Sequence, residues 1–341
     1  MAAKAQKVSN PPNPWASSHV EWLGEPPEAR LQVYEEEARS IITANDSPDV
    51  PFTYGVNPYR GCFHGCAYCY ARPTHQYLDL GAGTDFERKI TVKINAPDLL
   101  YRELRKPGWE REPLAFSGVT DCYQPLEANY RVTRRCLEMC RDAGNPVVVI
   151  TKSALIRRDA DLLADIASGP GARVYVSIPF ADDETGWAIE PHAAAVSQRF
   201  KTIAALSDAG IETGVAIAPV IPALNDSAIP EILERAHEAG ATRSFMILLR
   251  LPREVASVFE ERLTAAFPDR ADRVMNTLRE MRDGVVSNPE FGERMTGSGP
   301  QWEMVRSLYD IHARKLGFLG RQEMSDANGI KKAGPLQASL F

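Results

Sequence analysis

No run of apolar residues in this 341-residue chain approaches the roughly 18 that a membrane-spanning helix needs. Residues 1–15 lack the apolar core of a signal peptide. Basic residues are not in excess either, because 39 Lys and Arg stand against 45 Asp and Glu, for a formal net charge of −6. These absences argue against a membrane protein and against nucleic-acid binding by bulk charge alone, and they predict a cytoplasmic protein.

Cysteine is also scarce, with six residues in the whole chain, which is too few for a disulfide scaffold. Three of them, Cys62, Cys66 and Cys69, nevertheless follow one another in a C-x3-C-x2-C pattern. Three thiolates on one loop can hold three irons of a [4Fe-4S] cluster and leave the fourth iron open. An open iron can bind S-adenosylmethionine (SAM), whose reductive cleavage yields a 5′-deoxyadenosyl radical. The pattern therefore predicts radical chemistry.

A zinc site is the alternative interpretation of the same cysteines. His64 or His75 would complete a Cys3His shell, which is a common structural zinc site. Zinc-binding loops usually carry paired C-x2-C units, and only one such pair is present. A non-catalytic protein that binds zinc or an iron–sulfur cluster remains a second hypothesis.

Short β-branched runs alternate with longer amphipathic segments, which predicts repeated βα units and a parallel sheet. The expected strands are Thr53–Asn57, Pro113–Ser117, Val147–Thr151, Val174–Ile178, Thr213–Ala218 and Phe245–Leu249. Six such units favour an α/β fold with a partial (β/α)6 TIM-like barrel, while a doubly wound sheet is the competing architecture. In both, ligands bind at the carboxyl ends of the strands.

The rest of the chain is expected to flank this core. Residues 1–50 are interpreted as an N-terminal arm with one helix around Gln32–Ile42, and residues 51–254 as the (β/α)6 core. Residues 255–320 are expected to form a helical C-terminal extension. Residues 321–341 show little periodicity and are predicted to be a flexible tail.

The segments RGCFHGCAYCYAR, TDCYQPLE and TGVAIAPVIPALND, with aromatic Tyr68 before the last cysteine, carry a family resemblance. From about Pro51 to Leu316 the chain resembles the radical SAM superfamily, in its spore photoproduct lyase-like (DNA repair photolyase-like) branch. The resemblance implies a partial (β/α)6 barrel, a [4Fe-4S] cluster and SAM as cofactors. It also implies an electron donor such as flavodoxin or ferredoxin.

The same resemblance implies a SAM pocket at the strand ends. Thr120, Lys152 and Ser177 fall where members of that branch contact SAM, and Tyr68 is expected near the adenine. Ordinary structural roles stay open for each: Thr120 as a turn cap, Lys152 in an ion pair, Ser177 bonded to its own backbone. His64 is either a residue that tunes the cluster or a solvent-facing loop residue.

At one position the sequence differs from the spore photoproduct lyase-like branch. Gly118 stands where spore photoproduct lyases carry a hydrogen-donating cysteine, so a donor would have to come from elsewhere. Cys122 is the nearest thiol and the candidate catalytic residue, with a buried core thiol as the alternative. The function hypothesis is a radical SAM enzyme acting on nucleic acid, with a damaged pyrimidine as a candidate substrate. A peptide or small metabolite is the alternative substrate.

Two further features bear on partners. Arginines recur in predicted loop regions and are interpreted either as a phosphate-binding groove or as solvated ion pairs: Arg131, Arg134, Arg135, Arg157, Arg158, Arg250 and Arg253. The C-terminal residues, with Gln337, Leu340 and Phe341, resemble the pentapeptide by which bacterial repair proteins bind the sliding clamp. The clamp is therefore a candidate partner, next to DNA.

Overall fold

The computed structural model describes residues 30–319, and its main element is a seven-stranded sheet. The strands lie in the order β10-β9-β8-β7-β6-β3-β2, and every neighbouring pair is parallel except β2 with β3. Their bounds are β2 (Ile42–Ala44), β3 (Tyr54–Val56), β6 (Leu114–Phe116), β7 (Val147–Thr151), β8 (Ala172–Ser177), β9 (Glu212–Val220) and β10 (Arg243–Leu248). The predicted strands are confirmed.

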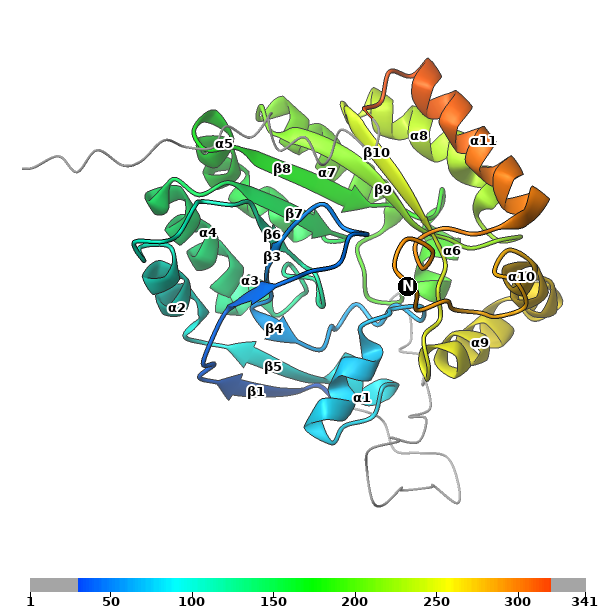
Figure 1. The fold of residues 1–341 in the computed structure, drawn as a ribbon, viewed down its shortest axis with the longest axis horizontal. Coiled ribbons are helices and arrows are strands. Elements are labelled where there is room, and N and C mark those ends of the chain that lie inside the picture. The colour runs from blue at the N-terminus through cyan, green and yellow to red at the C-terminus, as the bar shows by residue number, and fades with distance from the viewer. Residues whose placement is uncertain (1–29, 320–341) are drawn as a thin grey trace, which may run out of the picture.

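Helices connect the parallel strands and cover the outer face of the sheet (Figure 1). They are α2 (Ala96–Glu103), α3 (Glu127–Tyr130), α4 (Val132–Ala143), α5 (Ala160–Ser168), α6 (Asp183–Ile189), α7 (Val196–Asp208) and α8 (Ile229–Glu238), with the 3-10 helices η1 (Arg72–Leu78), η2 (Ala154–Asp159) and η3 (Asp226–Ala228). The six strands β3 and β6 to β10 follow one another in space as in sequence. Because a doubly wound sheet reverses its strand order, this arrangement confirms the partial (β/α)6 barrel.

The predicted helix around Gln32–Ile42 is wrong. Strand β1 (Gln32–Glu36) pairs in parallel with β5 (Lys89–Lys93), and β5 pairs antiparallel with β4 (Tyr59–Arg60). These three strands form a second, small sheet beside α1 (Thr84–Arg88) (Figure 1). Val33 and Tyr34 have high strand propensity, and pairing with a distant segment overrides the helical pattern of the local sequence.

Up to residue 319, three helices follow strand β10: α9 (Val255–Ala266), α10 (Pro268–Glu280) and α11 (Gly299–Lys315). Helix α9 contacts α6 and α11 contacts α8, so both pack on the barrel. The boundaries proposed between arm, core and extension stay predictions. The clamp-like residues Gln337, Leu340 and Phe341 and the tail from 321 onward lie outside the described residues.

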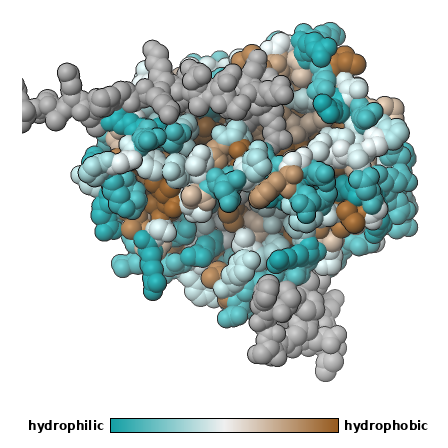
Figure 2. Space-filling model, in the orientation of Figure 1, coloured by the Kyte–Doolittle hydropathy of each residue, from teal (hydrophilic) through white to brown (hydrophobic). Residues whose placement is uncertain are grey.

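The surface in Figure 2 mixes hydrophilic and hydrophobic residues, with the hydrophobic ones in small patches. Among residues 30–319, no helix combines the length and the apolar character that crossing a bilayer requires.

The central strands carry apolar residues on both of their faces. On β7, Val147 and Val149 are completely buried against the helices, whereas Val148 and Ile150 point to the inside of the barrel. The inner face of β7 to β10 carries an apolar cluster of its own, built around Tyr175 and Phe245. Gly214 makes room for it, because a Cβ there would come within 2.6 Å of the Tyr175 ring. The barrel interior is therefore lined rather than filled.

Candidate active site

The three cysteines of the C-x3-C-x2-C motif lie on the loop after β4 and line one wall of a cavity. Cys62 and Cys66 are buried, and Cys69 is partly exposed. Gly61 and Gly65 turn the loop with positive φ angles of 75° and 66°. At Gly61 a Cβ would lie 2.9 Å from the Phe86 carbonyl oxygen, so only glycine fits there.

Arg72 holds this loop in place and was not singled out by the sequence analysis. Its guanidinium is completely buried and donates hydrogen bonds to the carbonyl oxygens of Gly65 and Cys66 at 3.1 and 2.8 Å. It also pairs with the buried Glu87 carboxylate at 2.5 Å. Arg262, from helix α9, reaches the same carboxylate at 3.4 Å. The C-terminal extension thus supports the cysteine loop.

Lys152 and Ser177, which the sequence analysis placed in one pocket, are in direct contact. Lys152 follows β7, and its ammonium group donates a hydrogen bond to the Ser177 hydroxyl at 2.5 Å. Thr120, after β6, lines the same cavity, and its buried hydroxyl has no hydrogen-bond partner among residues 30–319. An orphaned buried hydroxyl is rare unless a ligand or water meets it, so this hydroxyl is suited to contact a ligand in the cavity.

A buried carboxylate, Glu190, ties these side chains to the cysteine loop. It pairs with Lys152 at 3.3 Å and with Arg199 at 2.5 Å, and it accepts a hydrogen bond from the Tyr68 hydroxyl. Burial opposes ionisation, but the Arg199 and Lys152 charges outweigh it and lower the pKa of Glu190. The sequence analysis missed Glu190 and Arg199, since neither belongs to a recognisable motif.

Asp121 organises the neighbouring strand ends. It accepts hydrogen bonds from the Lys152 amide at 2.8 Å and the Thr151 hydroxyl at 2.7 Å, and it lies 3.3 Å from Nδ1 of His64. Burial disfavours a charged imidazole, yet the Asp121 carboxylate raises the pKa of His64 to about 10. His64 is buried, so the solvent-facing interpretation of this residue is wrong.

The cavity has a volume of about 300 Å³. Its walls are the cysteine loop and the strand ends, and its floor is the apolar inner face of the barrel. The floor residues are Val148, Ile150, Tyr175, Ala216, Ala218, Phe245 and Ile247. Tyr70 and Arg250 line the same cavity, and the Arg250 guanidinium lies 4.6 Å from the centroid of the Tyr70 ring.

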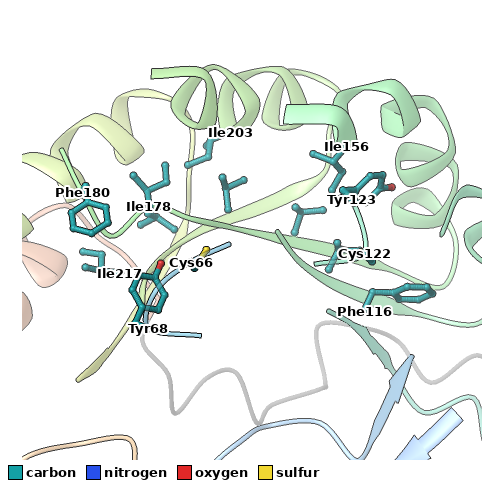
Figure 3. Packing of buried hydrophobic residues seen from close by; sticks show 14 of the residues in the cluster. Cys66, Tyr68, Phe116, Cys122, Tyr123, Ile156, Ile178, Phe180, Ile203 and Ile217 are labelled. Atoms are coloured by element: carbon teal, nitrogen blue, oxygen red, sulfur yellow. The ribbon is translucent and has the colours of Figure 1, made fainter. Parts of the chain in front are cut away.

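Cys122 does not belong to this cavity. Its side chain is completely buried, it is absent from the lining, and it lies close to Phe116 and well apart from Cys66 and Tyr68 (Figure 3). Its position is that of a core thiol, which was the alternative interpretation, so the structure gives no support to hydrogen donation by Cys122.

Two arginines of the predicted basic groove, Arg134 and Arg158, are neutralised by carboxylates. Arg134 and Arg158 both pair with the buried Asp159 carboxylate at 2.8 Å, and Arg158 also pairs with Glu127 at 2.9 Å. For these two arginines the ion-pair interpretation holds. Of the seven arginines singled out in the sequence, only Arg250 lines the cavity.

The family model of the radical SAM superfamily matches residues 56–236, which hold the cysteine loop and most of the barrel strands. The chain belongs to the radical SAM superfamily. Over 294 residues it is 37% identical to an uncharacterized protein of Mycobacterium tuberculosis, covering 86% of this chain and 83% of that protein. Radical SAM enzymes use a [4Fe-4S] cluster and SAM, so these are its cofactors.

Two further matches, one in sequence and one in fold, carry descriptive names. A radical SAM Nalpha-GlyT isomerase of Pseudomonas phage M6 is 25% identical over 269 residues, covering 77% of this chain and 52% of that protein. The fold is similar to that of a spore photoproduct lyase variant solved with bound AdoMet and dinucleoside spore photoproduct. The TM-score is 0.61 at 16% identity, with 89% of this chain and 87% of that one covered.

The residues of the radical SAM site fit these cofactors. Three thiols line one cavity beside an orphaned hydroxyl and a lysine, which are suitable partners for a cluster and a zwitterionic ligand. Burial raises the pKa of Cys69 to about 11, and bound iron would stabilise its thiolate.

The zinc alternative has no geometric support. Across residues 30–319, no three His, Cys, Asp or Glu side chains converge as a single metal ion requires. The imidazole of His64 is held by Asp121, and Nε2 of His75 bonds the Lys89 carbonyl at 2.9 Å.

Proposed function

We propose that this radical SAM enzyme acts on nucleic acid, with a damaged pyrimidine as its substrate. The observation that carries the proposal is the cavity, which joins the cysteine loop to an apolar floor across the barrel. A flat, mostly apolar base suits such a floor, and a cavity of about 300 Å³ lies at the lower end of the range for small-molecule sites. A structural neighbour at 16% identity, spore photoproduct lyase, was solved with a dinucleoside spore photoproduct, which supports this substrate class.

When bound, the cluster and SAM supply a 5′-deoxyadenosyl radical that abstracts a hydrogen atom from the substrate. The protein's part is to bind and orient. In the proposal, Lys152 offers its ammonium group to the SAM carboxylate, and Thr120 and Ser177 offer hydroxyls. Tyr68, held by Glu190, supports the wall beside the adenine. A flavodoxin- or ferredoxin-type electron donor is part of the proposal.

The test is an anaerobic turnover assay with reconstituted enzyme, SAM and a reductant, on UV-irradiated and intact oligonucleotides. We expect faster release of 5′-deoxyadenosine with irradiated DNA and loss of lesion mass by mass spectrometry. The variant Cys69→Ala should give neither product, because it lacks one cluster ligand. Unchanged mass of both oligonucleotides, with 5′-deoxyadenosine released at the same rate as without DNA, would favour the peptide or small-metabolite alternative.

A further inference from the structure

A cationic group in the cavity wall, Arg250, has no anionic partner among residues 30–319. Arg250 follows strand β10, is partly buried and lines the cavity. Its guanidinium lies over the ring of Tyr70, the residue next to Cys69, at 4.6 Å from the ring centroid. This stacking fixes the guanidinium plane while leaving its N–H groups free to donate.

Two neighbouring arginines show that this positive charge is not balanced locally. Arg294 is neutralised by Asp49, with 2.5 Å between guanidinium and carboxylate. Arg282 donates hydrogen bonds to the carbonyl oxygens of Leu248 and Leu249. It forms no ion pair with a carboxylate in the part of the chain that the structure describes. Burial and the nearby Arg250 charge lower the pKa of Arg282 to about 10. The region therefore carries a positive surplus.

Arg250 is the member of this trio that faces the cavity, since Arg282 and Arg294 are absent from the lining. Within residues 30–319, no carboxylate lies at ion-pairing distance from Arg250. The Asp49 carboxylate acts on Arg250 through its charge, but it is paired with Arg294. A partly buried guanidinium without an acid is unfavourable unless a ligand brings one. The adjoining floor is apolar.

We propose that Arg250 binds an oxyanion of the substrate, whose apolar body lies on the floor formed by β7 to β10. The oxyanion is the phosphate of a nucleotide or the carboxylate of an amino acid or aromatic acid, because a planar guanidinium recognises both in the same bidentate way. Arg250 is thus a specificity residue in the cavity that Thr120, Lys152 and Ser177 also line. The inference rests on the proposed function only in assuming that this cavity receives the substrate.

The test measures dissociation constants on SAM-loaded, reconstituted enzyme kept anaerobic without reductant, so that nothing turns over. Two pairs of probes distinguish a phosphate ligand from a carboxylate ligand, and each pair consists of a charged molecule and its uncharged analogue. One pair is the thymidine dinucleotide d(TpT) and its uncharged methylphosphonate analogue; the other is indole-3-propionate and its amide. In wild type, we expect one charged probe to bind about tenfold or more tightly than its neutral twin.

Arg250→Gln should abolish that preference, whereas Arg250→Lys, which keeps the charge, should retain part of it. Arg253→Gln is the matched control, because Arg253 is exposed, lies on the same loop and does not line the cavity. The Arg253→Gln variant should keep the wild-type preference for the charged probe. Iron content and SAM affinity, measured on each variant, check that the cluster loop is intact.

Three results would overturn the inference: no preference for either charged probe in wild type, an undiminished preference in Arg250→Gln, or a tenfold loss of SAM affinity in that variant. The last would assign the guanidinium to the SAM carboxylate. Preference for the carboxylate pair alone would support Arg250 as an anion-binding residue and contradict the nucleic-acid substrate proposed above. The experiment can therefore contradict the nucleic-acid substrate without contradicting anion binding by Arg250, and the reverse.

Discussion

The variant Glu190→Gln tests whether the buried carboxylate organises the SAM-binding strand ends. Glu190 is completely buried and meets Arg199 at 2.5 Å and Lys152 at 3.3 Å. Gln keeps the shape of the side chain but removes its charge, so the buried Arg199 and the partly buried Lys152 would lose their carboxylate partner. Breaking a buried pair in this way costs about 3–5 kcal/mol of unfolding free energy.

This free energy converts into a measurable shift of the melting temperature. With an unfolding entropy of about 2.1 cal/mol/K per residue, the melting temperature of a chain of this length falls by roughly 1.4 °C for each kcal/mol of lost stability. The expected decrease for Glu190→Gln is therefore about 4–7 °C. Differential scanning calorimetry on the reconstituted protein measures it. The matched control is Glu231→Gln, because Glu231 forms an exposed i,i+4 pair with Arg235 at 2.9 Å. That variant should shift by less than about 1 °C. Equal shifts in both variants would refute the reasoning.

Three further predictions concern the cluster, SAM and pH. Cys69→Ala should lower bound iron and acid-labile sulfide, and wild-type content of both would contradict its assignment as a cluster ligand. Lys152→Met should weaken SAM binding by roughly tenfold to a hundredfold, as measured by calorimetry, while Lys201→Met on the exposed side of α7 should not. Burial and the Arg88 charge lower the pKa of His192 to about 4, so its contribution to stability is present above about pH 6.5 and is lost as the pH falls towards 4. A midpoint near 6.5 in an NMR titration of His192 would contradict this.

The parts of the fold that could be predicted are those with local signals. Strand β7 was expected at Val147–Thr151 and is found there, because four apolar β-branched residues stand in a row between two helical segments. Strand β1 was missed, because Gln32–Glu36 becomes a strand by pairing with β5, far along the chain. No pattern within that segment records its partner.

In the candidate site, too, some residues could be predicted from local sequence signals and others could not. The cysteine motif and the candidate residues at the carboxyl ends of β6, β7 and β8 could be named from sequence, since parallel strands end at one edge and the motif is specific. Glu190 could not, because its partner Tyr68 is 122 positions away and a lone glutamate carries no motif. Arg72 stands inside the quoted motif, yet only the fold shows that its guanidinium ties the loop carbonyls together.

The arginines show why charge patterns alone mislead. In sequence, Arg134, Arg158 and Arg250 look equivalent, each next to another basic residue or in a predicted loop. In the fold, Asp159 neutralises the first two, whereas Arg250 faces an apolar cavity without a carboxylate in ion-pairing range within residues 30–319. What a ligand recognises is the charge that the protein leaves unbalanced, and that quantity depends on contacts between segments far apart in the chain. An arginine count therefore cannot locate an anion site, but a list of unpaired guanidinium groups can.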